Sequence, residues 1–209
     1  MSADFPVRGR LFVIAAPSGA GKTSLVRAAM DRDPTLSFSV SYTTRSPRPG
    51  EVDGRDYHFV SPEVFERMVL DGAFLEHATV FGNRYGTGQE ATEAVLAQGC
   101  SLILDIDYQG AQQVRARVPE VVDIFILPPS RQTLERRLRN RRTDSPAAIA
   151  RRLADSVEEI SHWSEFRYVV VNDNFEQAVR DLAVIVAGQG AALEADRPGL
   201  AELAARLRG

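Results

Sequence analysis

Short apolar runs recur along the chain, and each is bounded by charged residues, Gly or Pro. Four of them have the length and the aliphatic, β-branched composition of strands that are buried on both faces. These runs are residues 11–15, 100–105, 122–127 and 168–171. Stretches of helical periodicity alternate with them, at residues 21–32, 89–98, 108–118, 130–142, 146–163 and 175–188. This alternation predicts an α/β fold with a parallel sheet covered by helices on both faces.

Two segments depart from the alternation. Residues 37–87 hold two alternating stretches, turn signals and a helical pattern at 62–70, which together predict a small, partly antiparallel lobe. Residues 130–161 predict a helical hairpin outside the core, because almost no apolar side chain lies between its two helical stretches. We therefore expect one domain, at about residues 9–188. The whole chain divides into a core of residues 1–36, 88–128 and 164–209, an inserted lobe of residues 37–87 and a helical lid of residues 129–163.

The C-terminal tail carries a further helical pattern. Asp196-Arg197-Pro198 is typical of a helix start, and apolar residues follow at helical spacing. They are Leu200, Leu203, Ala204 and Leu207. The pattern predicts a helix that docks either on the core or on a partner, and it leaves both possibilities open.

A glycine-bearing turn joins the first apolar run to the first helical stretch. Its sequence is Ala16-Pro17-Ser18-Gly19-Ala20-Gly21-Lys22-Thr23. In this context backbone N–H groups converge on one spot and attract an anion. A lysine at a helix N-terminus is disfavoured by the helix dipole unless an anion is bound there. The turn therefore predicts a phosphate loop, with Lys22 reaching the outer phosphates of a nucleotide and Thr23 binding magnesium; the alternative is an ordinary strand–helix turn with a surface lysine.

Composition narrows the classes of function. A formal net charge of −3 over 209 residues argues against general nucleic-acid or membrane-surface binding. The single cysteine, Cys100, excludes an internal disulfide and is expected to be a small core residue. The sequence shows neither a signal-peptide pattern nor an apolar run long enough to span a membrane, so we expect a cytoplasmic protein. Because Cys and His residues are not clustered, we expect no zinc site built by the protein.

Two acids, Asp105 and Asp107, end the second apolar run. Side chains alternate along a strand, so the two would share a face at the carboxyl edge of the sheet, where the phosphate loop also lies. One of them could then support magnesium through water. The alternative is a pair of solvated acids at a strand end.

A second anion site is predicted in the lobe. Residues 41–48 carry Arg45, Arg48 and four Ser or Thr hydroxyl groups, and guanidinium groups bind phosphate bidentately. Tyr57 and Tyr85 lie in the same segment. The alternative is a solvated basic turn.

Glu76 lies in a mostly apolar stretch, and a partly buried carboxylate needs donors. Guanine offers two in parallel, N1–H and the exocyclic N2–H, whereas adenine presents an acceptor at N1. Glu76 would therefore select guanine. The alternative is an ion pair with a nearby Lys or Arg.

Six arginines and one acid lie between residues 131 and 142, and Arg152 follows on the next helical stretch. Arg137 and Arg141 are four residues apart and hence on one helical face. Mobile arginines of this kind neutralise a phosphoryl group during transfer. The alternatives are a solvated helix face and, against the net charge, nucleic-acid binding.

Taken together, these motifs resemble the guanylate kinase family over most of the chain. The resemblance rests on the phosphate loop and on six further motifs in the same order. These are Thr43-Thr44-Arg45-x-Pro47-Arg48-x-Gly50-Glu51, Phe74-Leu75-Glu76, Gly82-Asn83-x-Tyr85-Gly86-Thr87, Leu104-Asp105-Ile106-Asp107-Tyr108-Gln109-Gly110, Phe125-Ile126-Leu127-Pro128-Pro129-Ser130 and Val171-Asn172-Asp173.

The resemblance implies a P-loop NTPase-type sheet with an inserted GMP-binding lobe and a helical lid, and the reaction ATP + GMP → ADP + GDP with Mg²⁺. It implies no nucleic-acid, membrane or obligate protein partner. The ATP residues would be Ala16, Pro17, Ser18, Gly19, Ala20, Gly21, Lys22, Thr23 and Ser24, with Asn172 near the base. The metal would be held by Thr23 and, through water, by Asp105.

The same resemblance assigns the acceptor and the catalytic residues. The GMP phosphate would be held by Arg45, Arg48, Tyr57 and Tyr85, and guanine would be bound by Ser41, Glu76, Thr87 and Asp107. The catalytic set would be Lys22, Arg45, Arg137, Arg141 and Arg152. Asn140-Arg141-Arg142 replaces the family's usual Gly-Arg-Gly, which is expected to reduce flexibility at the lid turn.

Two rival functions remain at this point. A non-catalytic, phosphoprotein-binding module of this fold would typically lose Lys22 and the lid arginines, which are present here. A different small-molecule kinase would have no reason to combine Ser41, Glu76 and Asp107.

Overall fold

The computed structural model describes residues 8–80, 82–140 and 146–209. The chain forms two compact units. The first holds Thr35–Val121 and the chain up to Phe12, and the second holds Val13–Pro34 and Val122–Gly209. The larger of two sheets has the strand order β2-β7-β1-β8-β9, and strand β1 (Leu11–Ala15) contributes residues to both units.

The first unit contains a parallel strand pair and a small mixed sheet. In the pair, β2 (Leu36–Phe38) runs parallel to β7 (Ser101–Asp105). The mixed sheet has the order β4-β3-β6-β5, in which β3 and β4 are parallel and the other neighbours antiparallel. Its strands are β3 (Tyr42–Thr43), β4 (His58–Phe59), β5 (Phe74–Val80) and β6 (Asn83–Gly88). The helices of this unit are α2 (Pro62–Leu70), α3 (Gln89–Ala97) and α4 (Tyr108–Arg117).

The second unit contains the parallel pair β8 (Val122–Leu127) and β9 (Tyr168–Val171). Every residue of β8 is buried, Asp123 included, as its mostly apolar run predicts for a strand covered on both faces. The helices are α1 (Lys22–Arg32), α5 (Arg131–Asn140), α6 (Pro146–Ser161), α7 (Phe175–Val186) and α8 (Leu200–Arg208), with short 3₁₀ segments at Trp163–Glu165 and Gly190–Leu193.

The predicted strands and helices are confirmed to within a few residues at each end, except among the strands of the lobe. There the alternating stretch 38–42 is not one strand: β2 ends at Phe38 in the larger sheet, and β3 begins at Tyr42 in the smaller one. Pairing of β2 with β7 removes Phe38 from the lobe, and this pairing joins residues more than sixty positions apart. Strands β5 and β6 were not predicted as strands from their composition. Cys100, expected in the core, is only half-buried.

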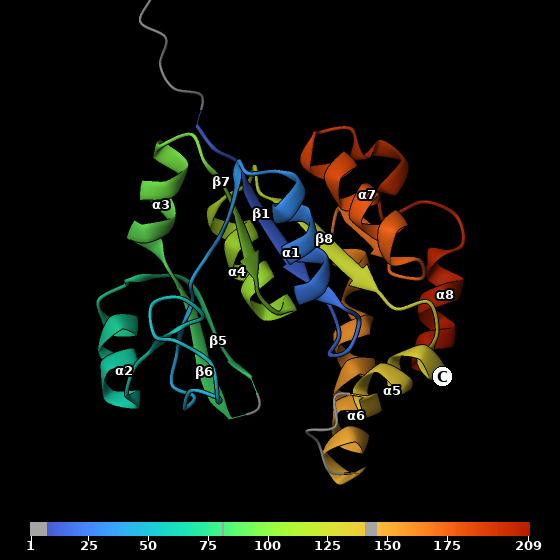
Figure 1. The fold of residues 1–209 in the computed structure, drawn as a ribbon, viewed down its shortest axis with the longest axis horizontal. Coiled ribbons are helices and arrows are strands. Elements are labelled where there is room, and N and C mark those ends of the chain that lie inside the picture. Colours follow the sequence, from blue (N-terminus) through green and yellow to red (C-terminus); the bar gives the residue numbers. More distant parts are fainter. Residues whose placement is uncertain (1–7, 81, 141–145) are drawn as a thin grey trace, which may run out of the picture. The chain divides into compact units, whose positions relative to one another are not determined.

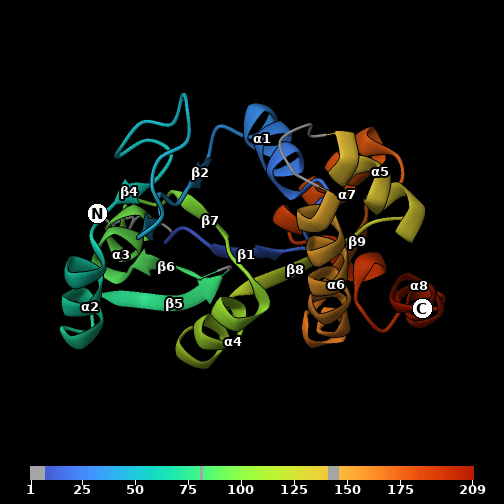
Figure 2. The same ribbon diagram turned by 90° about the horizontal axis from the view of Figure 1, so that it is seen from below.

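The tail packs on the chain's own second unit. Helix α8 buries Leu200, Ala204 and Leu207 and contacts α5 and α6, beside which it lies in both views (Figures 1 and 2). Of the two docking sites that its periodicity left open, the structure therefore selects one within the chain. Among the described residues, none of the helices has the length and apolar character needed to cross a membrane.

Candidate active site

The predicted phosphate loop lies in the second unit, between the end of β1 and the start of α1. Gly19 and Gly21 have φ angles of 92° and 96°, in the left-handed region that other residues rarely adopt. A Cβ atom at Gly21 would also lie 2.5 Å from Nδ2 of Asn172. Thr23 and Ser24 are exposed in the first turn of α1. The loop therefore has the glycine-dependent backbone of a phosphate site.

Two side chains hold this loop through one carbonyl. The carbonyl oxygen of Ala20 accepts hydrogen bonds from Nδ2 of Asn172 (2.7 Å) and from Nη1 of Arg137 (3.2 Å). Arg137 also donates to the carbonyl oxygen of Asn172 at 3.0 Å. In a trans peptide the N–H points opposite to the C=O, so the N–H of Gly21 is directed away from Asn172 and Arg137. These contacts fix the direction in which the loop presents that donor.

Arg137 was predicted from its place in a run of arginines, and the structure gives it a buried partner. Burial, followed by repulsion from Arg136, lowers the pKa of its guanidinium group from the ordinary value. Arg141, the second predicted lid arginine, lies outside the described residues.

Helix α6 contacts the loop at Ser18. The N–H of Ser18 donates to Oε2 of Glu159 (3.0 Å), and Nη1 of Arg152 donates to Oγ of Ser18 (3.4 Å). Arg152 and Glu159 are seven residues apart and therefore share a helix face. Arg152 was predicted as a site residue, whereas Glu159 was missed; its two-turn spacing from Arg152 was the available signal.

In the first unit, Arg45 is held by Glu51 and lies against two aromatic rings. The ion pair is bidentate, with both N–O distances 2.9 Å. The guanidinium carbon is 5.3 Å from the ring centre of Tyr57 and 5.7 Å from that of Phe59. Hydrogen bonds to Glu51, and more weakly to Tyr85, raise the pKa of Arg45. Sequence analysis did not single out Glu51 as a site residue.

Tyr57 and Tyr85 meet edge to face, with ring centres 6.0 Å apart. Burial raises the pKa of Tyr57, with the nearby charge of Asp105 as the next cause. Arg48 has an exposed side chain, and its backbone N–H donates to Oε2 of Glu51 at 2.6 Å. Glu51 thus orders the loop that carries both predicted phosphate-binding arginines.

Glu76 is buried, with 3% of its surface exposed, and its Oε1 accepts a 2.6 Å hydrogen bond from Oγ1 of Thr87. Removal from water raises the pKa of Glu76 to about 7, and the charge of Asp107 acts in the same direction. Its partner is a hydroxyl group on β6 and not the Lys or Arg of the alternative interpretation. A carboxylate held this way keeps accepting capacity for further donors.

Asp105 and Asp107 are not on one strand face, because β7 ends at Asp105 and Asp107 lies beyond it. Asp107 is instead the N-cap of α4. Its Oδ1 accepts from the N–H of Gly110 and its Oδ2 from Nε2 of Gln109, each at 2.9 Å. The prediction of a shared face is therefore wrong. Ser41 is half-buried, and its carbonyl oxygen accepts from the N–H of His58 at 2.9 Å.

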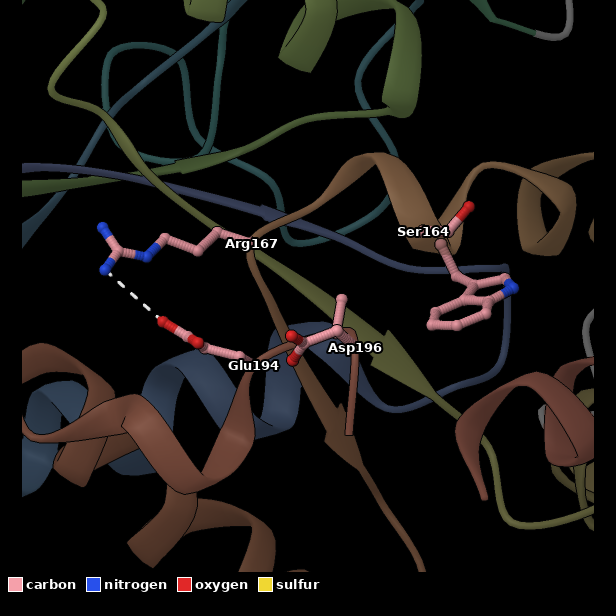
Figure 3. A pocket seen from close by; sticks show the side chains of 6 residues that line it. Ser164, Arg167, Glu194 and Asp196 are labelled. Atoms are coloured by element: carbon pink, nitrogen blue, oxygen red, sulfur yellow. Dashed lines mark hydrogen bonds and ion pairs between the residues drawn. The ribbon is translucent and has the colours of Figure 1, made fainter. Parts of the chain in front are cut away.

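One pocket, of about 480 Å³, lies elsewhere in the second unit (Figure 3). Its lining residues are Trp163, Ser164, Arg167, Glu194, Ala195 and Asp196. Arg167 points toward Glu194, at 3.5 Å. None of the predicted site residues lines this pocket, and its two carboxylates would repel a phosphate, so we do not assign a nucleotide to it.

The chain matches the family model described as guanylate kinase over residues 8–189. The chain belongs to the guanylate kinase family. Among curated relatives, the guanylate kinase of Alkalilimnicola ehrlichii is 53% identical over 93% of this chain and 96% of its own length. That of Nitrosococcus oceani is 58% identical over 85% of this chain and 88% of its own length. The crystal structure of guanylate kinase from Anaplasma phagocytophilum is 35% identical, with a TM-score of 0.71 and 94% of each chain covered.

Family membership confirms the resemblance, the P-loop type of parallel sheet with flanking helices, and the class of enzyme. The chain is a nucleoside monophosphate kinase with ATP and GMP as its substrates. The rival interpretation as a non-catalytic module is therefore rejected.

Proposed function

We propose that this chain transfers the γ-phosphoryl group of ATP to GMP with the residues that its sequence motifs identify. The ATP phosphates bind at the loop of the second unit, and GMP binds in the lobe of the first. The observation that carries the proposal is the buried carboxylate of Glu76, hydrogen-bonded to Thr87 at 2.6 Å. Guanine supplies two parallel donors to such a carboxylate, whereas adenine would place an acceptor against it.

On the ATP side, residues Ala16 to Ser24 surround the phosphates and Lys22 neutralises the outer ones. Support comes from the left-handed glycines and from the fixed carbonyl of Ala20. Asn172 lies beside the base. Its Nδ2 is committed to Ala20, and within the described part of the chain its buried Oδ1 has no hydrogen-bond partner.

Magnesium is the cofactor that we propose to accompany ATP. Thr23 binds it through its hydroxyl group and Asp105 through water. Both are hard oxygen donors of the kind that Mg²⁺ prefers, and Thr23 is exposed in the first turn of α1. When bound with ATP, the ion neutralises charge on the outer phosphates.

On the GMP side, Arg45, Arg48, Tyr57 and Tyr85 hold the phosphate, while Ser41, Glu76, Thr87 and Asp107 bind the base. The contacts of Arg45 with Glu51, Tyr57 and Phe59 support this, because they leave the guanidinium group oriented before a ligand arrives. The negative charge of the phosphoryl group during its transfer is neutralised by Arg137, Arg141 and Arg152. We keep the division into core, GMP-binding lobe (37–87) and lid (129–163), cytoplasmic localisation and independence from any protein partner as parts of this proposal.

The test is a substrate panel. ADP formation is measured with ATP, Mg²⁺ and each of GMP, AMP, CMP and UMP. We expect turnover with GMP and at least a hundredfold lower kcat/KM with the others, since a mismatched buried polar group costs a few kcal/mol. Equal turnover of AMP and GMP would overturn the assignment of Glu76 to guanine.

A further inference from the structure

Side chains of helix α4 form hydrogen bonds with the backbone of strand β5 immediately before and after Glu76. Before it, Nη1 of Arg117 donates to the carbonyl oxygens of Phe74 (2.6 Å) and Leu75 (2.9 Å). After it, Gln113 bonds both backbone groups of His77: Oε1 accepts from the N–H (3.1 Å) and Nε2 donates to the C=O (2.8 Å). The backbone on both sides of Glu76 is thus attached to one helix.

The part of strand β5 that bonds to helix α4 contains a β-bulge. Strand β5 pairs with β6 from Phe74 to Val80, but the register shifts between Phe74 and Glu76, leaving Leu75 as the extra residue. A β-bulge redirects neighbouring side chains and locally disrupts the ladder. Arg117 donates to the two consecutive carbonyls at this bulge, and so holds the irregular backbone that decides where Glu76 points.

Gln113 acts as a substitute for a neighbouring strand. Strand β5 lies at the edge of its sheet, so the side of it away from β6 has no strand partner within that sheet. A primary amide offers one acceptor and a donor pair, which matches the N–H and C=O of a single peptide residue. A carboxylate in the same place would lack the donor and would face the carbonyl of His77 with negative charge.

The first turn of α4 fits closely against the Glu76 side chain. A Cβ atom built on Gly110 would lie 2.5 Å from Oε2 of Glu76. Asp107 already occupies the N–H of Gly110. The helix therefore limits the position of one carboxylate oxygen, while Thr87 binds the other.

From these contacts we propose that Gln113 and Arg117 are positioning residues for guanine recognition: they hold β5 so that the Glu76 carboxylate meets the donors of the base. The inference rests on the proposed function, since it assumes that Glu76 binds guanine. It adds that selectivity depends on two α4 side chains that touch the strand backbone and need not touch the nucleotide.

The experiment measures binding of GMP, of inosine monophosphate (IMP) and of ATP by titration calorimetry. IMP is the probe because its base lacks the exocyclic N2 amino group but keeps N1–H. The variants are Gln113→Ala, Gln113→Glu and Arg117→Met. Gln112→Ala is the matched control, because Gln112 is an adjacent, exposed glutamine of the same helix. Thermal unfolding followed by circular dichroism verifies that each variant folds, and Gln113→Asn and Arg117→Lys replace any that does not.

We expect each variant to weaken GMP binding about tenfold and to lower the ratio of GMP to IMP affinity, with ATP affinity within twofold of wild type. Gln113→Glu should have the largest effect and Gln112→Ala none. Folded variants with the wild-type GMP/IMP ratio, or with equal losses for ATP and GMP, would overturn the inference. A wild-type chain that binds GMP without forming GDP contradicts the proposed function alone, and one that binds no GMP contradicts both.

Discussion

Thr87 donates a 2.6 Å hydrogen bond from Oγ1 to Oε1 of Glu76, and both side chains are buried. The neutral donors of Thr87 do not replace the water that a free carboxylate binds, and the charge of Asp107 adds repulsion. For this reason the pKa of Glu76 is raised to about 7. The residue proposed to bind guanine is consequently one whose ionisation changes near neutral pH.

The first prediction concerns the pH dependence of GMP binding. Only the ionised carboxylate can accept both guanine donors. With a pKa of about 7, roughly nine-tenths of Glu76 is ionised at pH 8 and about one-tenth at pH 6. We expect the KM for GMP to rise roughly tenfold as the pH is lowered from 8 to 6, as measured from initial rates.

The control for this measurement is Glu76→Gln, which has no carboxylate at that position. The phosphate of GMP titrates near pH 6 and affects both proteins alike. If the variant shows the same pH dependence as wild type, Glu76 is not its cause.

The second prediction concerns stability without ligand. The folded chain holds the Glu76 proton up to about pH 7, whereas the unfolded chain loses it near 4.5. The folded state therefore binds more protons between these values, and its free energy of unfolding falls as pH rises through this window. The accumulated loss above pH 7 is about 3 kcal/mol.

Glu76→Gln removes this loss. We expect the variant to be more stable than wild type at pH 8 by roughly 2–3 kcal/mol and to match it at pH 5, as measured by urea denaturation. A variant less stable than wild type at pH 8 would show that the buried charge is compensated.

The third prediction concerns the phosphate loop. Lys22→Ala removes the cation proposed to neutralise the outer phosphates of ATP and leaves the lobe unchanged. We expect turnover to fall by orders of magnitude, while GMP binds with nearly its wild-type Kd. Retention of wild-type turnover in steady-state assays would contradict the assignment of the loop.

The fourth prediction concerns the Arg45–Glu51 pair. Glu51→Gln removes the bidentate partner of Arg45 and weakens the bond to the N–H of Arg48, so both phosphate-binding residues lose their orientation. We expect the KM for GMP to rise about tenfold and that for ATP to stay constant. Glu63→Gln, an exposed acid of the same unit, is the control and should change neither value.

The fifth prediction concerns Asn172, which is 2% exposed. Asn172→Asp places a carboxylate against the carbonyl of Ala20 in place of the donor. A buried polar mismatch of about 2 kcal/mol lowers Tm by roughly 4–8 °C in a chain of this length. We also expect a higher KM for ATP, because the loop loses its support. Calorimetry and initial rates provide the two measurements, and wild-type values in both would show that Asn172 does not hold the loop.

Much of the fold could be predicted because the signals are local. The bounds of β1, α2 and β8 are as predicted, since each depends on neighbouring residues alone. For α2 these include a capping serine at Ser61 and a proline at the first helical position. The Lys22 loop was predictable for the same reason: its glycines, its lysine and the flanking strand and helix are contiguous.

The sequence by itself determined which residues are chemically suited to the reaction and, for the phosphate loop and the arginine-bearing helices, in which elements they lie. Only the tertiary structure decided which long-range contacts hold these residues in position. Arg137 reaches Ala20, 117 residues away, and Glu159 reaches Ser18, 141 residues away. Arg117 reaches Phe74, 43 residues away. Such contacts depend on chain segments that folding brings together, whereas the spacing of residues along the sequence encodes only what happens within a helix, a strand or a turn.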